Sequence, residues 1–323
     1  MASQKVVDWL LEPDQPSIQY LTLTHILERR ETDSEVRQAR ARISKAGWVA
    51  VILARRYPGG WWVRDRHPMW PKYIATNWNM LALSDLGATR TIPEVETSCE
   101  YWMKKSPLNG GGVGGMSNGH GHHCYTGNMT RALIKFGYAD DPRVRKALAW
   151  LVQTAHPKGG WTCWSFGDGP AKGRTLDGWE GLSALAAYPR SKWTPAMKEC
   201  VERGAEFFLD RELHRQGARH EPWYRFHWPV HYFYDLLVGL DVLTSLGYGD
   251  DPRLSFALEH LKKRRRADGR WNLDAVHPDG GPRYEAWFKE HPKDRPSPLS
   301  FETARRASKM ITLRALTVLS RVD

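Results

Sequence analysis

The sequence predicts an all-α chain in which six helix pairs close into a ring, an (α/α)6 toroid with an inner and an outer layer of helices. Two observations indicate this fold. Residues 137–143 (GYADDPR) recur as residues 247–253 (GYGDDPR), an offset of 110 (247 − 137 = 110). Trp161 and Trp271 share the same offset. Because two separate landmarks repeat together, the whole unit between them is predicted to repeat.

Apolar segments rich in small residues recur at about half of that offset, and each is predicted to be a helix followed by a more charged helix and a turn. They are residues 17–30, 73–87, 124–138, 177–188, 231–247 and 302–320. A helix that is apolar around most of its surface has to be covered on most sides. Alternation with amphipathic helices therefore favours two layers, and six units favour a closed ring over an open superhelix.

The turns of the repeat have a local physical explanation. Asp141 and Asp251 each supply a helix N-cap, and the proline that follows each of them fits the first helical position. Gly137 and Gly247 can adopt the left-handed conformation that ends a helix. The repeats also run through the glycine-rich stretch 106–123 and the proline-rich stretch 272–300. We therefore expect residues 1–323 to form one domain.

Composition narrows the class of protein. Of the 323 residues, 41% are hydrophobic and 26% are charged, which is typical of a globular chain. We expect a cytoplasmic protein, because there is no membrane-spanning apolar run and the first residues lack the apolar core of a signal peptide. Four cysteines are too few for a disulfide scaffold and are expected to be reduced.

The formal net charge of +11 permits anionic partners, but no nucleic-acid-binding motif is present, so we expect no nucleic acid. The densest basic run, residues 262–266, is typical of a solvated helix end, since cations favour a helix C-terminus. Peripheral contact with a membrane surface is the alternative interpretation. No feature of the sequence indicates an obligate protein partner.

The Gly160-Trp161 and Asp268-Gly269-Arg270-Trp271 turns, with a helix-pair period of about 50 residues, resemble squalene–hopene cyclases and protein prenyltransferase β subunits. The similarity covers nearly the whole chain and extends to uncharacterised single-domain bacterial relatives. The resemblance implies an isomerase or lyase that acts on an apolar, isoprenoid-like small molecule in a central cavity. The reaction would be acid–base chemistry: cyclisation, isomerisation, or hydration and dehydration. The Asp-x-Asp-Asp motif of the cyclases is absent.

Candidate catalytic residues fall at the expected starts of the inner helices. Asp177 and Glu180 have i, i+3 spacing, so the two carboxyls could divide the roles of acid and base. The alternative is a capping box, which needs the same spacing. His231 and Asp235 have i, i+4 spacing, and a carboxylate beside a histidine raises its pKa and orients its ring for proton transfer. The alternative for this pair is a structural contact.

Cys124 is a further catalytic candidate and, with His122 and His231, a candidate zinc ligand. The resemblance to protein prenyltransferases implies this set, because their zinc segment is Asp-x-Cys-Tyr at a helix start and Cys124-Tyr125 matches its second half. His122 stands in place of the aspartate. A zinc-dependent transferase or hydrolase is therefore an alternative function. The other interpretation is a histidine-bearing loop beside a packed cysteine.

Polar and aromatic residues on or near the inner helices are expected to line the cavity and bind the substrate. These residues are Trp78, Tyr125, Asn128, Trp179, Tyr232 and Tyr234. In cyclases, such rings stabilise carbocations by cation–π attraction. The same rings could simply fill the core of a small ring of helices. A toroid that binds a ligand or acts as a scaffold without catalysis is therefore the third functional hypothesis.

Overall fold

The computed structural model describes residues 3–63, 65, 68–106, 108–109, 111–113, 121–161, 178–215, 220–276, 289–291, 298 and 300–322. Helices dominate these residues, which confirms the all-α prediction for the described part of the chain. Two short strands, β1 (Leu108–Asn109) and β2 (Gly112–Val113), pair in antiparallel register with Leu108 opposite Val113. None of the helices described here has the length and apolarity needed to cross a bilayer.

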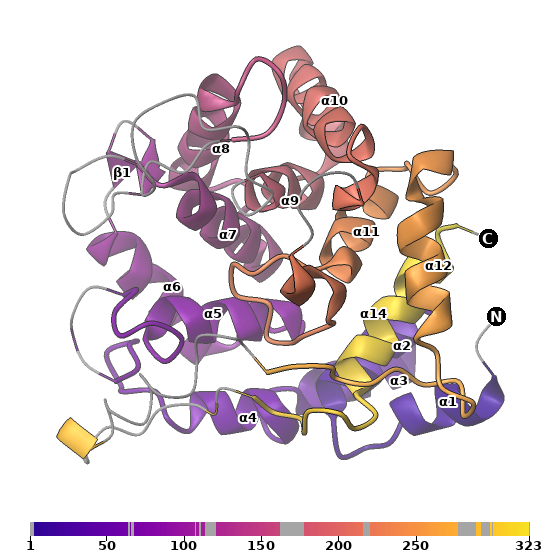
Figure 1. The fold of residues 1–323 in the computed structure, drawn as a ribbon. Helices are drawn as coiled ribbons and strands as arrows, with labels where there is room; N and C mark the ends of the chain where they lie inside the picture. The colour runs from indigo at the N-terminus through magenta and orange to yellow at the C-terminus, as the bar shows by residue number, and fades with distance from the viewer. Residues whose placement is uncertain are drawn as a thin grey trace.

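Six apolar helices surround the centre of the molecule (Figure 1). They are α2 (Pro16–His25), α5 (Thr76–Asp85), α7 (His123–Leu133), α9 (Trp179–Ala187), α11 (Leu236–Ser245) and α14 (Lys309–Leu319). Each overlaps one predicted apolar segment, although α11 and α14 begin later than predicted. In space, α5 packs on α7, α7 on α9, α9 on α11, α11 on α14, and α14 on α2. Neighbours in sequence order are therefore also neighbours in space.

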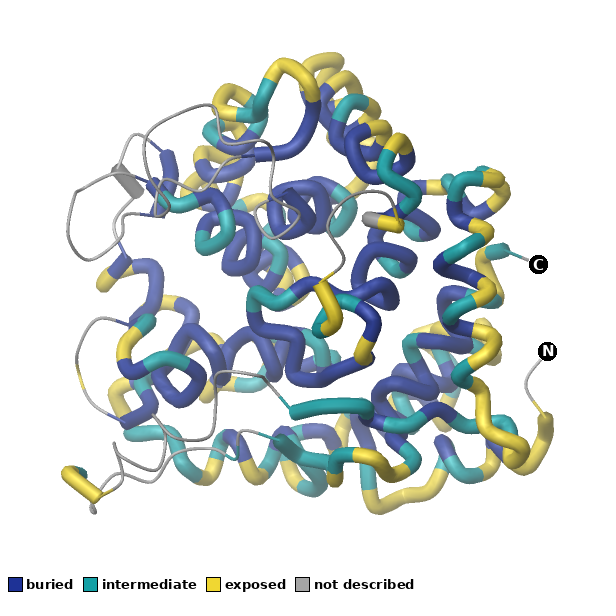
Figure 2. Tube along the Cα trace, viewed as in Figure 1, coloured by how far each residue is buried: buried dark blue, intermediate teal, exposed yellow. Residues whose placement is uncertain are grey.

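Seven further described helices lie outside these six, with their exposed residues facing outward (Figure 2), and all of them except α4 carry charged side chains. They are α1 (Gln4–Leu10), α3 (Ser34–Arg42), α4 (Gly47–Leu53), α6 (Pro93–Lys105), α8 (Pro142–Thr154), α10 (Pro195–Leu209) and α12 (Ser255–Lys263). Single turns of other helix types occur at Ile134–Tyr138, Arg190–Lys192, Glu212–His214, Glu221–Tyr224 and Pro252–Leu254. The sixth predicted pair is wrong in one respect, because no described helix follows α14.

Three buried tryptophans end outer helices in the same way. The indole N–H of Trp62 donates to the carbonyl of Ile52 at 2.9 Å, ten residues earlier in the chain. Trp161 and Trp271 donate to the carbonyls of the residues ten positions before them, Leu151 and Leu261, both at 2.8 Å. Each bond satisfies one of the last carbonyls of an outer helix, which has no partner within the helix.

A glycine with positive φ lies two residues before each of these tryptophans: Gly60 (100°), Gly159 (86°) and Gly269 (84°). A Cβ atom on Gly60 would come within 2.7 Å of the Thr97 carbonyl on α6, and one on Gly159 would overlap a carbonyl on α10. A Cβ atom on Gly269 would lie 3.0 Å from Val6 on α1. Each turn therefore packs on an outer helix. The turn after α4 packs on α6, the turn after α8 packs on α10, and the turn after α12 packs on α1.

The repeated Asp-Asp-Pro-Arg turns are built as predicted. Asp141 and Asp251 accept hydrogen bonds from the backbone N–H groups of Arg143 and Arg253. The preceding glycines have φ values of 99° (Gly137) and 92° (Gly247). Each arginine also forms an ion pair with the preceding outer helix, with Glu100 of α6 at 3.0 Å and with Glu206 of α10 at 2.8 Å. The repeat thus includes a surface link between successive outer helices.

The basic run at residues 262–266 forms the end of α12 and the turn after it, as the helix-end interpretation predicts. Arg264 pairs with Asp274 at 2.8 Å, and Arg266 pairs with Asp268 at 3.1 Å. The guanidinium of Arg265 lies over the ring of Trp271, 5.4 Å from its centre. These arginines therefore stabilise the turn itself. Contact with a membrane surface stays a prediction.

We predict that Gly159→Ala destabilises the protein much more than Gly137→Ala. Both positions have positive φ, so each substitution should cost about 1–2 kcal/mol for the left-handed backbone. Only at Gly159 does the new methyl group also overlap a backbone carbonyl, that of Arg203, while at Gly137 it would make ordinary van der Waals contact with the Arg90 side chain. Urea denaturation of the two variants gives the comparison. Equal losses of unfolding free energy would contradict the close packing of the turn on α10.

Candidate functional site

A pocket of about 370 Å³ lies between the six inner helices, mostly along their C-terminal halves. All six helices contribute to its lining. Its charged lining residues are Asp85, Arg131, Lys135, Asp241, Arg314 and Arg321, and its apolar lining includes Leu21, Trp179, Val230, Val238, Met310 and Leu313. The sequence-based prediction placed the site at the helix starts, and for this pocket that placement is wrong. The segment between α10 and α11 crosses the centre on that side (Figure 1).

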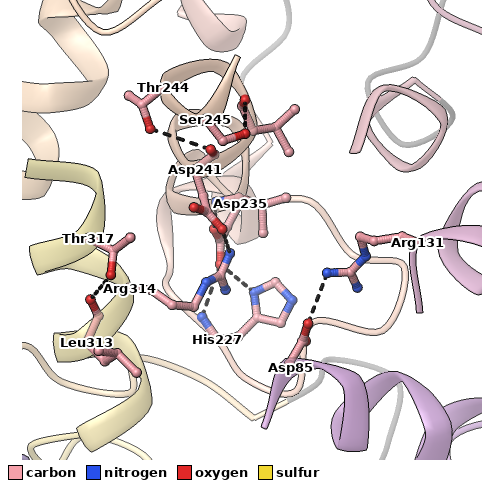
Figure 3. A network of polar contacts seen from close by, with 12 residues as sticks. Asp85, Arg131, His227, Asp235, Asp241, Thr244, Ser245, Leu313, Arg314 and Thr317 are labelled. Carbon is pink, nitrogen blue, oxygen red and sulfur yellow. Dashed lines mark hydrogen bonds and ion pairs between the residues drawn. The ribbon is translucent and has the colours of Figure 1, made fainter. Parts of the chain in front are cut away.

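Ion pairs form two opposite walls of the pocket (Figure 3). On one wall, Asp85 at the end of α5 accepts from Nη1 of Arg131 at 3.0 Å and from Nζ of Lys135 at 3.3 Å. On the other wall, Asp241 of α11 lies 2.8 Å from Nη1 of Arg321 and 3.7 Å from Nη2 of Arg314. No sequence pattern revealed these residues, because they come from four parts of the chain that are far apart: residues 85, 131–135, 241 and 314–321.

Electrostatics keeps both wall carboxylates ionised. Burial alone would raise the pKa values of Asp85 and Asp241. The nearby cations outweigh this effect and hold both pKa values below the usual range, Arg131 chiefly for Asp85 and Arg314 chiefly for Asp241. The pocket lining therefore has four basic side chains, two on each wall, but only two carboxylates, Asp85 and Asp241, to pair with them. The pocket has a positive potential, and neither carboxylate can donate a proton near neutral pH.

Aromatic rings pack against one another at the opposite end of the inner helices. The ring of His231 stacks on Tyr73 with 5.4 Å between centroids and meets Trp78 edge-on at 5.3 Å. Trp78 also contacts Tyr232 at 5.7 Å and Tyr125 at 6.0 Å. These rings are not among the lining residues of the pocket described above, and an aromatic cavity at the helix starts stays a prediction.

Six residues were predicted to bind substrate. Trp179 is the one member of this set among the described residues that line the central pocket. Tyr234 is buried and stacks on Phe208 with 6.1 Å between ring centroids. Asn128 is buried within α7, and its side-chain oxygen has no hydrogen-bond partner among the described residues. The apolar periodicity of an inner helix does not reveal which of its faces meets the pocket and which meets a neighbouring helix.

The predicted pairing of His231 with Asp235 is wrong. Helix α11 begins at Leu236, so both residues precede it and do not share a helical face. Asp235 is the N-cap of α11, accepts from the backbone N–H of Val238 at 2.8 Å, and lies 2.8 Å from Nδ1 of His227. Burial, together with the nearby His227, lowers the pKa of His231 to about 3, the reverse of the predicted direction.

The His227–Asp235 pair has the arrangement of a proton-transfer dyad. Both side chains are buried, and the carboxylate also accepts from the backbone N–H of His227 at 3.1 Å. With its proton on Nδ1 toward Asp235, the imidazole keeps a lone pair on Nε2. Nε2 is buried and has no hydrogen-bond partner among the residues that the structure describes. Although burial opposes it, His227 and Arg314 lower the pKa of Asp235, so the carboxylate stays ionised.

The second predicted carboxylate pair is described only in part. Asp177 lies outside the described residues. Glu180 is fully buried in the first turn of α9, beside Trp179 and one turn before Ser183, both of which line the pocket. The N-cap of α9 is Gly178, so the capping-box alternative has the wrong register. A catalytic role for Asp177 with Glu180 stays a prediction.

The predicted zinc ligand set is wrong. His122, Cys124 and His231 are all described, and no group of three or more His, Cys, Asp or Glu side chains in the described part of the chain could hold a metal ion. His231 packs against Tyr73 and Trp78, while the ring of His122 meets Tyr125 edge-on at 6.2 Å. Cys124 is half-buried at the start of α7. Cys163 lies outside the described residues.

The whole structure is similar to the type II terpene cyclase MstE from Scytonema. With the apo form, the TM-score is 0.46 at 15% sequence identity, over 96% of this chain and 87% of that chain. With an arginine-to-alanine variant of MstE in complex with its substrate geranylgeranyl dihydroxybenzoate, the TM-score is 0.47 at the same identity and coverage. No protein-family model and no curated protein matches the sequence.

We predict that His231 makes the fold sensitive to acid. Its pKa is about 3 in the native state and about 6.5 in an unfolded chain. Between these values the unfolded chain binds a proton that the native state does not, so stability falls as the pH drops from about 6.5 to 3, by a few kcal/mol. In His231→Asn, which cannot titrate and suits the positive φ of 52°, this loss should shrink.

The measurement is the urea midpoint at pH 4, 5, 6 and 7 for both proteins. Absolute stability is expected to fall in the variant because ring packing is lost, so the informative quantity is the slope with pH. His220→Asn, which changes an exposed histidine, is the control and should keep the wild-type slope. A slope unchanged in His231→Asn would show that this histidine is not the acid-sensitive group.

Proposed function

We propose that the chain is a closed (α/α)6 toroid, and that it is an enzyme of terpenoid-cyclase type acting on an apolar, isoprenoid-like molecule in its central pocket. The reaction is acid–base chemistry in which the His227–Asp235 dyad transfers the proton. The observation that carries the proposal is Nε2 of His227, which is buried without a hydrogen-bond partner among the described residues while Asp235 holds Nδ1.

Two features support ring closure. One pocket is lined by all six inner helices, which is the arrangement that a closed ring produces. In addition, the two ends of the chain meet: Arg270, in the turn after α12, lies 4.1 Å from the centre of the Trp9 ring on α1. Lys309 at the start of α14 lies 2.8 Å from both Glu12 and Asp14. Helix α1 thus serves as the outer partner that no helix after α14 provides.

The pocket and the dyad together favour particular reactions. A volume of about 370 Å³ with apolar side chains and a few polar groups suits a small organic ligand. In the view of Figure 3, the His227 ring lies between the Arg314 and Arg131 side chains. As a general base, Nε2 would take a proton from an allylic carbon whose double bond is conjugated with a carbonyl, and would return it to the far carbon of that double bond. The carbonyl oxygen of the ligand holds the electron pair between the two transfers.

Double-bond isomerisation is therefore favoured, and hydration or dehydration needs the same proton transfer with water as co-reactant. Cyclisation begun by alkene protonation requires a carboxylic acid that is neutral at working pH. Asp85, Asp235 and Asp241 do not meet this requirement, because neighbouring cations and hydrogen-bond donors lower their pKa values. These three carboxylates are therefore poor candidates for the general acid. A histidine that acts as a general base is the better-supported proton-transfer group.

We predict that Trp9 and Arg270 are energetically coupled across the junction of the two chain ends. A cation–π contact of this kind is worth about 0.5–1 kcal/mol. In a double-mutant cycle of Trp9→Ala and Arg270→Ala, urea denaturation should therefore show a coupling of this size. Arg29, an exposed arginine on the loop after α2, serves as the control partner for Trp9. Strict additivity of Trp9→Ala and Arg270→Ala would contradict ring closure through α1.

We also predict that His227→Gln abolishes proton transfer to isoprenoid probes, lowering the rate at least about 100-fold. The protein would be incubated in D₂O with geranylgeranial, an isoprenoid aldehyde whose carbonyl is conjugated with a double bond, and deuterium incorporation followed by mass spectrometry. Asp235→Asn keeps an N-cap residue for α11 but loses the carboxylate that orients the imidazole, so it should also be slow. Asp251→Asn makes the same change at another cap and should leave the rate unaltered.

Two results would contradict this proposal. One is deuterium incorporation in His227→Gln at the wild-type rate. The other is binding of a probe by the wild-type protein with no incorporation, which would instead indicate a ligand-binding toroid without catalysis.

A further inference from the structure

We propose that the central pocket recognises an oxyanion, a carboxylate or a phosphate ester carried by the ligand, through the unoccupied edge of the Arg131 guanidinium. This inference rests on the proposed function only in taking the central pocket as the ligand site. It adds a class of substrate: an amphipathic molecule with an acidic group at one end and an apolar body.

The hydrogen bonding of Arg131 leaves one edge of its guanidinium available. Nη1 donates to Asp85 at 3.0 Å. Nε and Nη2, which form the side edge of the group, are buried and have no hydrogen-bond partner among the described residues. Burying N–H groups without an acceptor is costly, so this edge is complete only when an acceptor pair occupies it. Two parallel N–H groups match the two oxygens of a carboxylate or phosphate.

The orientation of this edge is fixed before a ligand arrives. Asp85 holds the Nη1 end, and the guanidinium carbon lies 5.7 Å from the centre of the Trp179 ring. The Arg131 side chain is only 12% exposed, so water cannot solvate it freely. A preoriented group loses little conformational entropy on binding, which favours affinity.

The opposite wall supplies a second cation. Nη1 of Arg314 is also buried without a partner among the described residues, and Nη2 is 3.7 Å from Asp241. Because Arg321 already binds Asp241 at 2.8 Å, the charge of that carboxylate is shared and Arg314 is only partly neutralised. Figure 3 shows Arg314 on α14 and Arg131 on α7 extending toward the same space from opposite sides.

The apolar part of the ligand also has a place in this pocket. Val230, Met310 and Leu313 line it together with the two arginines. An inorganic anion would leave these side chains without a partner, and a pure hydrocarbon would leave the guanidinium edges unpaired. A molecule with both parts satisfies the whole lining.

The test is isothermal titration calorimetry with decanoate, decyl phosphate and the uncharged decanol. The wild-type protein should bind at least one of the two anions and bind decanol more weakly; the preferred anion identifies the acidic group as carboxylate or phosphate. Arg131→Lys keeps the charge but loses the two-pronged edge, so anion affinity should fall about 10- to 100-fold with decanol unaffected. Arg37→Lys on exposed α3 is the matched control and should bind as wild type.

Circular dichroism and the thermal midpoint establish that each variant is folded. If Arg131→Lys does not fold, Arg314→Lys replaces it, and a similar loss of anion affinity is expected. Wild-type affinity for the anions in the arginine variants would overturn the inference, as would decanol binding as tightly as the anions, or no binding of either anion. His227→Gln separates the two proposals: it should keep anion binding while losing proton transfer. Loss of one property without the other shows which proposal fails.

Discussion

The structure depends on how the outer helices end. Each of three buried indoles satisfies a carbonyl at the end of an outer helix, and the glycine two residues earlier lets the turn touch another outer helix. A side chain on Gly159 would force α10 away. Because the spacing of the outer layer is fixed in this way, the inner helices are held at a set distance from the centre. Contacts between the outer helices therefore help to set the size of the central pocket.

The two ends of the inner helices differ in which side chains lie between them. At their starts, aromatic rings such as those of Trp78 and Tyr73 pack against one another, and His231, which is buried among them, stays uncharged near neutral pH. At their ends, the centre is hollow, and charged side chains can lie there because each carboxylate has a cationic partner. Polarity in the pocket is thus compatible with a stable fold.

The sequence predicts the local features well and the central ones poorly. The caps at Asp141 and Asp251 and the left-handed glycines were predictable because turn chemistry is decided within a few residues. The His227–Asp235 pair was not, because it joins residues eight apart across an irregular segment, and i, i+4 spacing pointed to His231 instead. Spacing carries information only inside a regular helix, and α11 begins after both histidines.

The ionic walls were missed for a related reason. Asp85, Arg131 and Arg314 lie on three different inner helices, and each looks like an ordinary interruption of an apolar pattern. Only the parallel packing of the helices brings them to one level (Figure 3). Burying a charged side chain on the apolar side of a helix costs free energy unless an oppositely charged group pairs with it. Such interruptions, repeated near the same end of several inner helices, are therefore a sequence signal for a central polar site, stronger than residue types gathered at helix starts.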